Sequence, residues 1–261
     1  MTEKEYILTH ILNCSRLDLY LDKFPAEEKF SAALFRILER RKKGEPIQYI
    51  TGSSEFMGLD FKVDKRVLIP RPETEILVEE ALKIAQSSEP TAQSILDIGT
   101  GSGNIAISLA RYLPECKITA VDISENAIKV AAENADLNQV KGRVEFIVSD
   151  LFSALAKSGE FDLIISNPPY ISTVEMENLP PEVRYEPRLA LLAGPESLDF
   201  YQRIIKDCPP YLKKGGIILL EMGYNQGIPI QEIFRQSGNF KILKVVPDYG
   251  NIERVIVAQK I

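Results

Sequence analysis

A glycine-rich loop in the middle of the chain has the spacing of a ligand-binding turn. The apolar run Ser94–Ile98 predicts a buried strand, Asn104 starts an expected helix, and Gly99, Gly101 and Gly103 lie between them. Glycine lets the backbone turn sharply and approach a ligand closely, while the free N–H groups at a helix start attract a carboxylate or a phosphate. The GxGxG spacing is a weak signal by itself, because a turn without a ligand uses glycine in the same way.

Acidic residues stand at the ends of the next two expected strands. Asp122 is placed to accept hydrogen bonds from a ribose diol, although it could also be an acid at the start of a helix capped by Ser124. Asp150 is placed to hold an adenine edge, with Leu151 or Phe152 against the ring. Open α/β sheets bind ligands at the carboxyl ends of their strands. A nucleoside ligand is therefore expected.

The acid before the loop distinguishes between nucleosides. Asp97 precedes Gly99, and a carboxylate there disfavours a pyrophosphate and favours a cationic group such as the amino group of S-adenosylmethionine. The order DxGxGxG resembles the first motif of the seven-stranded class I methyltransferases. This resemblance implies S-adenosyl-L-methionine as cofactor and S-adenosyl-L-homocysteine as product. The methionine part is then assigned to Asp97, Gly99, Thr100, Gly101, Ser102 and Gly103, the ribose to Asp122, and the adenine to Asp150 and Leu151.

The strongest chemical signal is Asn167-Pro168-Pro169-Tyr170, directly after an expected buried strand. The two prolines stop strand pairing and fix the backbone, so the Asn167 side chain and the Pro168 carbonyl present two acceptors to a planar NH2 group. Pro169 and Tyr170 offer flat apolar faces for the same group. An amide or exocyclic amine nitrogen is a poor nucleophile, and holding it in line with a sulfonium methyl would supply the proximity that the reaction needs. The alternative is a strand-ending turn with an Asx cap.

The NPPY tetrapeptide resembles methyltransferases that act on planar NH2 groups, namely adenine N6 enzymes and glutamine N5 enzymes. The whole chain resembles the HemK/PrmC family of release factor glutamine methyltransferases, through NPPY, the GTGSG loop and the stretches Pro46–Gly52, Glu55–Gly58, Val67–Glu75, Tyr185–Leu191 and Leu220–Gly227. Two stretches depart from the family pattern: Ala193–Tyr201 replaces a GGxDGLxxY run, and Asp248–Arg254 is looser than D-x-x-G-x-x-R. Neither touches the expected methyl-transfer centre.

The resemblance implies N5 methylation of the glutamine in the Gly-Gly-Gln motif of class I peptide chain release factors. Asn167 and the Pro168 carbonyl would bind the glutamine amide, and Pro169 and Tyr170 would flank it. Asn167 is also counted among the cofactor-binding residues. Arg71 and Glu73 would either shape this substrate pocket or pair with each other. The alternative enzyme is an N6-adenine methyltransferase of nucleic acid, and a non-enzymatic alternative is a nucleoside sensor, which gives no reason for NPPY.

The elements around these residues alternate between strand and helix. Strands are expected at 94–98, 117–121, 144–148, 161–166, 216–221, 240–246 and 254–259, and helices at 104–112, 125–137, 198–212 and 230–236. This alternation predicts an α/β fold of the class I, Rossmann-like methyltransferase type, with a seven-stranded mixed sheet whose closing pair is antiparallel.

The part of the chain before this sheet has a different pattern. Residues 1–45 predict a small helical domain, which the resemblance makes a substrate-docking domain, with a second helix starting at Pro25. Residues 46–70 predict a hairpin linker with strands at 47–51 and 61–68, and residues 71–261 a methyltransferase domain whose first helix runs to Gln86.

The composition of the chain argues against several other classes of protein and of functional site. The 261 residues carry a net charge of -6, which argues against tight nonspecific nucleic-acid binding. His10 is the only histidine, and the three cysteines include no CxxC pair, so a histidine-based triad, a metal site and structural disulfides are not expected. The chain has neither a long apolar run nor an apolar signal-peptide core at its N-terminus, so we expect a cytoplasmic protein that binds no membrane. We also expect a monomer.

Overall fold

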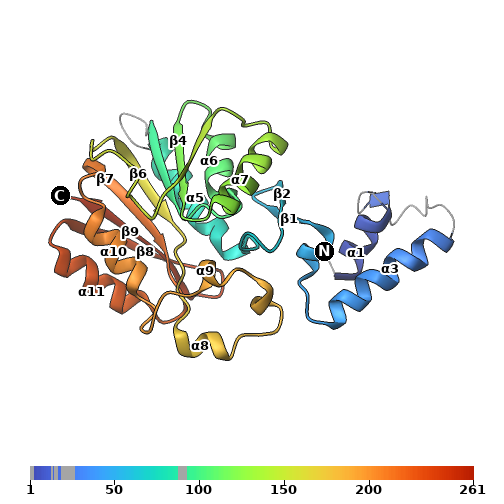
Figure 1. Cartoon of the computed structure of the whole chain (residues 1–261). Coiled ribbons are helices and arrows are strands. Elements are labelled where there is room, and N and C mark those ends of the chain that lie inside the picture. The colour runs from blue at the N-terminus through green and yellow to red at the C-terminus, as the bar shows by residue number, and fades with distance from the viewer. Residues whose placement is uncertain (1–2, 13, 15–16, 19–26, 88–92) are drawn as a thin grey trace.

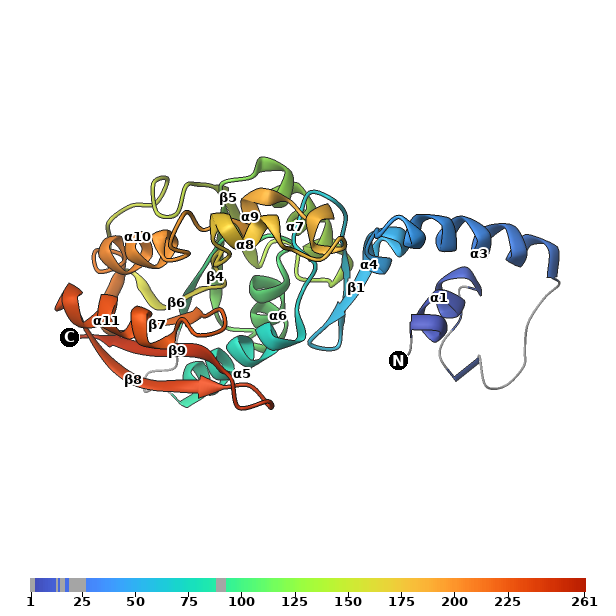
Figure 2. The same ribbon diagram turned by 90° about the horizontal axis from the view of Figure 1, so that it is seen from below.

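The computed structural model describes residues 3–12, 14, 17–18, 27–87 and 93–261. Its first helices are α1 (Glu3–Leu12) and α3 (Glu27–Lys42). Figures 1 and 2 show them to one side of the large sheet, joined to it through a short hairpin. Pro25, where we expected the second helix to start, lies outside the described residues. Within the described residues, no helix is long and apolar enough to cross a bilayer.

The hairpin is formed by β1 (Ser53–Phe56) and β2 (Leu59–Lys62), so the strand expected at 61–68 starts earlier and ends at Lys62. Met57 and Gly58 join these strands with φ angles of 51° and 69°, as a tight turn that follows the twist of the strands requires. The strand expected at 47–51 was wrong, because these residues form helix α4 (Ile47–Thr51). Pro46 precedes its first turn and Gly52 ends it in the left-handed conformation with φ 77°.

A seven-stranded sheet carries the rest of the molecule. Its order is β5-β4-β3-β6-β7-β9-β8, with β9 antiparallel to both of its neighbours and the other pairs parallel. The strands are β3 (Ser94–Ile98), β4 (Lys117–Asp122), β5 (Val144–Val148), β6 (Phe161–Ser166), β7 (Leu212–Glu221), β8 (Phe240–Pro247) and β9 (Glu253–Lys260). The predicted α/β fold with a mixed seven-stranded sheet is confirmed.

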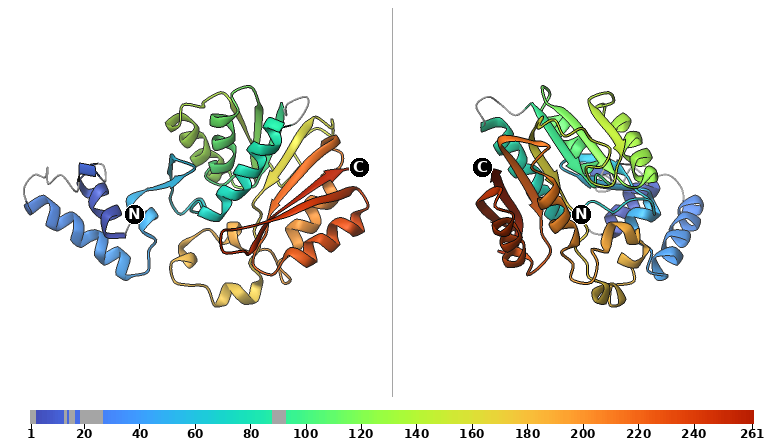
Figure 3. Two further views of the ribbon diagram at one scale, coloured as in Figure 1. Left: turned by 180° about the vertical axis from the view of Figure 1, so that it is seen from behind. Right: turned by 60° about the vertical axis from the view of Figure 1, so that its left-hand side comes forward.

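Helices cover both faces of this sheet (Figures 1 and 3). Apolar residues of α5 (Pro72–Ser87), α6 (Asn104–Tyr112) and α7 (Glu125–Leu137) pack in a core on one face. A second core on the other face is built with α10 (Asp199–Asp207) and α11 (Gly227–Ser237). Helix α10 is shorter than expected and β7 starts earlier, because Pro209 and Pro210 cannot donate the hydrogen bonds that would continue the helix.

The connection from β6 to α10 holds elements that the sequence pattern did not predict. They are α8 (Thr173–Glu177), a 3-10 turn (Val183–Tyr185) and α9 (Arg188–Leu191). The end of α3 contacts this connection: Arg41 pairs with Glu182 at 2.7 Å, and the Tyr185 hydroxyl donates to the Lys43 carbonyl at 3.0 Å. The helical N-terminal segment therefore lies over the same end of the sheet as NPPY.

Candidate functional site

Two cavities meet at the carboxyl ends of the parallel strands. The first, of about 340 Å³, is lined by the glycine loop and by residues after β4 and β5. The second, of about 360 Å³, lies between the linker and the β6–α10 connection. Leu68, Asn167, Pro168 and Ala190 line both of them. The NPPY motif thus forms part of the wall between the two spaces.

The glycine loop approaches the first cavity with two of its three glycines. Gly99 and Gly101 line the cavity at φ angles of 74° and 56°, and a Cβ on either would meet no atom within 4 Å. Gly103, at φ 82°, faces inward instead, where a Cβ would lie 2.7 Å from Cδ1 of Ile107 and 3.1 Å from Cβ of Ala131. The first two glycines leave space for a ligand, and the third allows close packing against α7.

Asp97 lies beneath this loop and not in the described lining of the first cavity. Its carboxyl is fully buried, with Oδ2 accepting from the Thr100 hydroxyl at 2.7 Å and Oδ1 lacking a partner within the described chain. Burial raises the pKa of Asp97 to about 7, against the opposing effect of the Thr100 hydrogen bond. Thr100 and Ser102 are also buried and lie outside that lining. A buried acid with an unsatisfied oxygen fits a nearby cationic ligand group.

Asp122 lines the first cavity at the end of β4. Its Oδ2 accepts from the Gly101 N–H at 2.9 Å and its Oδ1 from the Ser124 N–H at 2.8 Å, so the carboxyl is held against the loop. Burial raises its pKa, and these two hydrogen bonds oppose the rise. Each oxygen keeps acceptor capacity toward the cavity, which suits a diol. Ser124 caps α7, as the alternative interpretation of this segment expected, and the ribose role of Asp122 stays a prediction.

Of the residues after β5, some line the first cavity and one lies in the hydrophobic core. Leu151 lines the first cavity, whereas Phe152 is buried and stacks on Tyr211 with ring centroids 4.6 Å apart. Asp150 also lines the cavity, and both of its carboxyl oxygens accept from Arg203, at 2.9 and 2.8 Å. Arg203 comes from α10 and lines the same cavity. No motif marked it in the sequence, because only the fold brings α10 to the end of β5.

Polar side chains in the protein interior form hydrogen bonds with the NPPY residues. The Asn167 amide nitrogen donates to the Thr74 hydroxyl on α5 at 3.0 Å. Glu221, at the end of β7, is buried with its Oε2 lacking a partner within the described chain, and burial raises its pKa to about 7. Tyr170 lines the second cavity, and its carbonyl accepts from the Gln226 amide at 3.1 Å. Sequence reasoning missed Thr74, Glu221 and Gln226 as individual site residues.

Arg71 lines the second cavity, and its partner there is Glu186, which is buried. The expectation that Arg71 might pair with Glu73 was wrong. Glu73 is exposed on the first turn of α5, outside the described lining of both cavities. Glu186 also accepts from the Ile69 N–H at 3.1 Å, so it joins the rigid linker segment to the β6–α10 connection.

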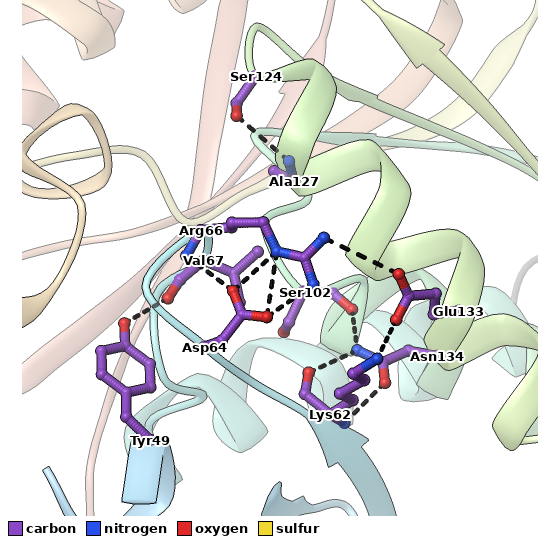
Figure 4. A network of polar contacts seen from close by, with 10 residues as sticks. All are labelled: Tyr49, Lys62, Asp64, Arg66, Val67, Ser102, Ser124, Ala127, Glu133 and Asn134. Atoms are coloured by element: carbon purple, nitrogen blue, oxygen red, sulfur yellow. Dashed lines mark hydrogen bonds and ion pairs between the residues drawn. The ribbon is translucent and has the colours of Figure 1, made fainter. Parts of the chain in front are cut away.

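The linker is tied to the glycine loop through Asn134 on α7 (Figure 4). This buried amide accepts from the Lys62 N–H at 2.7 Å and donates to the Ser102 carbonyl at 2.8 Å. Farther along the linker, the Tyr49 hydroxyl donates to the Val67 carbonyl at 2.6 Å. Val67 lines the first cavity, so the segment that leads to the N-terminal helices also forms part of the ligand wall.

Two family models match the chain. A PrmC N-terminal domain model matches residues 2–52, and a methyltransferase small domain model matches residues 73–179. The first match ends just before the hairpin, and the second contains the glycine loop and NPPY.

Full-length relatives agree with these matches. A release factor glutamine methyltransferase of Fusobacterium nucleatum is 44% identical over 100% of this chain and 73% of its own. One of Thermodesulfovibrio yellowstonii is 41% identical over 99% of this chain and 92% of its own. Among solved structures, a methyltransferase from Pyrococcus furiosus has a TM-score of 0.58 at 19% identity, covering 88% of this chain and 99% of that one. This last likeness concerns the fold.

Proposed function

The chain belongs to the release factor glutamine methyltransferase family, and we propose that it methylates the side-chain amide nitrogen, N5, of a glutamine in a peptide chain release factor. The methyl donor in this proposal is S-adenosylmethionine, and the glutamine is that of the Gly-Gly-Gln motif in class I release factors. The observation that carries the proposal is the wall shared by the two cavities, because Asn167 and Pro168 line both. A donor in one cavity and an amide in the other would meet at these two residues.

The first cavity fits the methyl donor. Gly99 and Gly101 leave space where a side chain would otherwise stand, Asp122 offers acceptors for a ribose, and Asp97 holds an unsatisfied buried oxygen close to the loop. When bound, S-adenosylmethionine supplies an electrophilic methyl group. Leu151 gives an apolar surface for the adenine, and Asp150 reaches its edge while paired with Arg203.

The second cavity fits the glutamine. The Asn167 oxygen and the Pro168 carbonyl accept the two hydrogens of the amide NH2 group, and Tyr170 restricts its plane. Pro169, expected on the same side, lines the first cavity instead. Positioning of this kind replaces translational and rotational freedom with a fixed geometry. In favourable cases this lowers the activation barrier by as much as roughly 7 to 11 kcal/mol. The proton leaves the methylated nitrogen to solvent after transfer, so no basic side chain is needed.

A labelling assay tests this function. The protein is incubated with S-adenosylmethionine labelled in its methyl group and with a class I release factor, the same factor with the Gly-Gly-Gln glutamine replaced, or adenine-containing DNA and RNA. We expect label on the intact release factor alone. Label on nucleic acid and none on the release factor would support the adenine N6 alternative instead.

Substitution of Asn167 tests its role within this function. Asn167→Ala removes the amide oxygen and is expected to abolish transfer while the affinity for S-adenosylmethionine changes by a small factor, because the glycine loop and Asp122 are untouched. Asn239→Ala, which changes an asparagine after α11, is the matched control and should leave both quantities unchanged. Loss of cofactor binding together with transfer would mean that Asn167 belongs to the cofactor site.

The helical N-terminal segment is proposed to dock the release factor in the cytoplasm. Phe35 on α3 is 65% exposed and offers an apolar contact on that segment. Phe35→Ser is expected to raise KM for the intact release factor and to leave KM for a short Gly-Gly-Gln peptide unchanged. Equal effects on both substrates would place the docking surface elsewhere.

A further inference from the structure

Gln226, in the turn between β7 and α11, contacts the NPPY motif from outside both cavities. The residue is 8% exposed and belongs to the described lining of neither cavity. Its amide nitrogen donates to the Tyr170 carbonyl at 3.1 Å. Tyr170 is in the described lining of the second cavity and not in that of the first. A side chain that lines no cavity thus contacts the residue that is expected to flank the substrate.

The orientation of the Gln226 amide is determined by backbone groups that can act in one sense only. Its oxygen accepts from the Gly223 N–H at 2.9 Å, and a backbone N–H cannot accept. Its nitrogen donates to the carbonyls of Tyr170 and Ser197, at 3.1 and 3.2 Å, and a carbonyl cannot donate. A flipped amide would place its oxygen against two carbonyls. The contact with Tyr170 therefore requires a donor here, and a side chain of the same size is not sufficient.

The same amide connects Tyr170 to two other segments of the chain. Gly223 belongs to the turn after β7, and Ser197 to the stretch Ala193–Tyr201, which departs from the family pattern. Ser197 has a φ of 59°, in the left-handed region that favours glycine, and its hydroxyl accepts from the Gln226 nitrogen at 2.9 Å. A residue keeps such a conformation where its surroundings hold it. Gln226 thus joins three segments at Tyr170.

The NPPY backbone has few hydrogen-bond donors of its own. The two prolines before Tyr170 carry no N–H, so they cannot donate to a neighbouring segment. After the motif, the Ile171 N–H donates to the Leu191 carbonyl at 3.0 Å. Between these points, Gln226 binds the Tyr170 carbonyl, and a Cβ on Gly223 would stand only 2.9 Å from Cδ2 of the Tyr170 ring. The turn after β7 therefore contacts both the backbone and the ring of Tyr170.

We propose that Gln226 is a positioning residue that holds Tyr170 in the wall of the second cavity by donating to its carbonyl, an inference that rests on the proposed function. It acts on the substrate through Tyr170, because Gln226 is absent from the described linings. Since Tyr170 is also absent from the lining of the first cavity, loss of this contact should affect the glutamine substrate and leave the methyl donor unaffected. A residue that only stabilised the fold would give no such difference between the two ligands.

Gln226→Met tests this role, because methionine has a similar length and no amide. We expect kcat/KM for the release factor to fall by roughly 10-fold, since the buried Tyr170 carbonyl loses its donor. The Kd for S-adenosylmethionine, measured by calorimetry, should stay unchanged. Gln259→Met is the matched control, because Gln259 on β9 also donates to a backbone carbonyl, that of Gly215 at 2.9 Å, and lies outside both linings. It should leave both quantities unchanged.

Gly223→Ala is a second variant, for the case in which Gln226→Met does not fold. Its methyl group would lie 2.9 Å from Cδ2 of Tyr170 and 2.8 Å from Oε1 of Gln226, while the amide itself is kept. The φ of Gly223 is not positive, so alanine adds crowding without backbone strain. We expect the same pattern, a lower kcat/KM for the release factor at an unchanged Kd for S-adenosylmethionine.

A carbonyl chemical shift gives a readout that does not depend on activity. In protein labelled with 13C-carbonyl tyrosine and 15N-isoleucine, only Tyr–Ile peptide bonds give a correlation, and the sequence has three of them, after Tyr6, Tyr49 and Tyr170. The Tyr170 signal is assigned by its loss in Tyr170→Phe. Its carbonyl shift should move upfield in Gln226→Met, where the hydrogen bond is lost, and should stay in place in Gln259→Met.

The outcomes separate this inference from the proposed function. An unchanged Tyr170 carbonyl shift or an unchanged kcat/KM in Gln226→Met would overturn the inference. Equal losses of kcat/KM and of cofactor affinity would overturn it as well, because they would indicate a general effect on the fold. A wild-type protein that does not methylate the release factor, but whose Tyr170 signal moves in Gln226→Met, would overturn the proposed function and leave the link between Gln226 and Tyr170 standing.

Discussion

Gly101 and Gly103 form a matched pair in which the same substitution should have different effects. Both have positive φ angles, 56° and 82°, so alanine at either position is strained by about 1 to 2 kcal/mol. A methyl group on Gly101 would meet no atom within 4 Å, whereas one on Gly103 would lie 2.7 Å from Cδ1 of Ile107 and 3.1 Å from Cβ of Ala131. The Ile107 methyl can turn away, but Ala131 is fixed on α7.

The crowding adds a second cost at Gly103 alone. Overpacking a tight contact costs about 1 to 3 kcal/mol, so Gly103→Ala should lose about 2 to 5 kcal/mol of stability in total and Gly101→Ala about 1 to 2 kcal/mol. For a chain of this size each kcal/mol corresponds to about 2 to 4 °C in Tm. The order is expected to reverse for ligand binding. Gly101 lines the first cavity, and its added methyl group should weaken S-adenosylmethionine binding by roughly 10-fold.

Thermal unfolding of the free proteins and calorimetric titration with S-adenosylmethionine measure the two effects. Gly103→Ala should show the larger fall in Tm, and Gly101→Ala the larger loss of affinity relative to its fall in Tm. Equal losses of Tm in the two variants would refute the packing argument. Normal affinity in Gly101→Ala would show that the ligand does not approach this part of the loop.

Three further predictions concern single interactions. Tyr49→Phe removes the hydrogen bond to the Val67 carbonyl and should cost about 1 to 3 kcal/mol, measured by urea unfolding, because the buried carbonyl is left unsatisfied. Arg203→Ala should change stability by less than about 1 kcal/mol, since its pair with Asp150 is half exposed, but should measurably weaken cofactor binding in calorimetry. The pKa of Asp97 is raised to about 7 from 3.8, so the folded protein keeps this proton while the unfolded chain loses it, and stability should fall as pH rises from about 4 to 7. Asp97→Asn should flatten that part of the stability–pH curve and weaken cofactor binding, and an unchanged curve would contradict the burial argument.

Much of the sheet could be predicted because its strands are buried in the fold and are also apolar in the sequence. Buried parallel strands appear as short apolar runs, and β3, β5 and β6 have the bounds that were expected. The segment 47–51 shows where this fails. Its residues favour strands, but Pro46 before it and Gly52 after it close a single helical turn, and local capping decided the outcome.

Of the residues at the two cavities, too, only some could be predicted from the sequence. Gly99, Gly101 and Asp122 could be found from the sequence because they stand where strands end, and the fold places them at the first cavity. Arg203 and Glu186 could not be found, because each meets its partner across a connection whose path the sequence does not reveal. Their charges look like ordinary surface charges until the chain is folded.

The last strand of the chain lies inside the sheet. Strand β9 is placed between β7 and β8, and Val255, Ile256, Val257 and Ala258 are fully buried. During synthesis, β7 and β8 therefore keep unpaired edges until β9 has been made. A chain without β9 would expose both edges and the core beneath them. Formation of the complete sheet thus depends on β9, the strand that is synthesised after both of its neighbours.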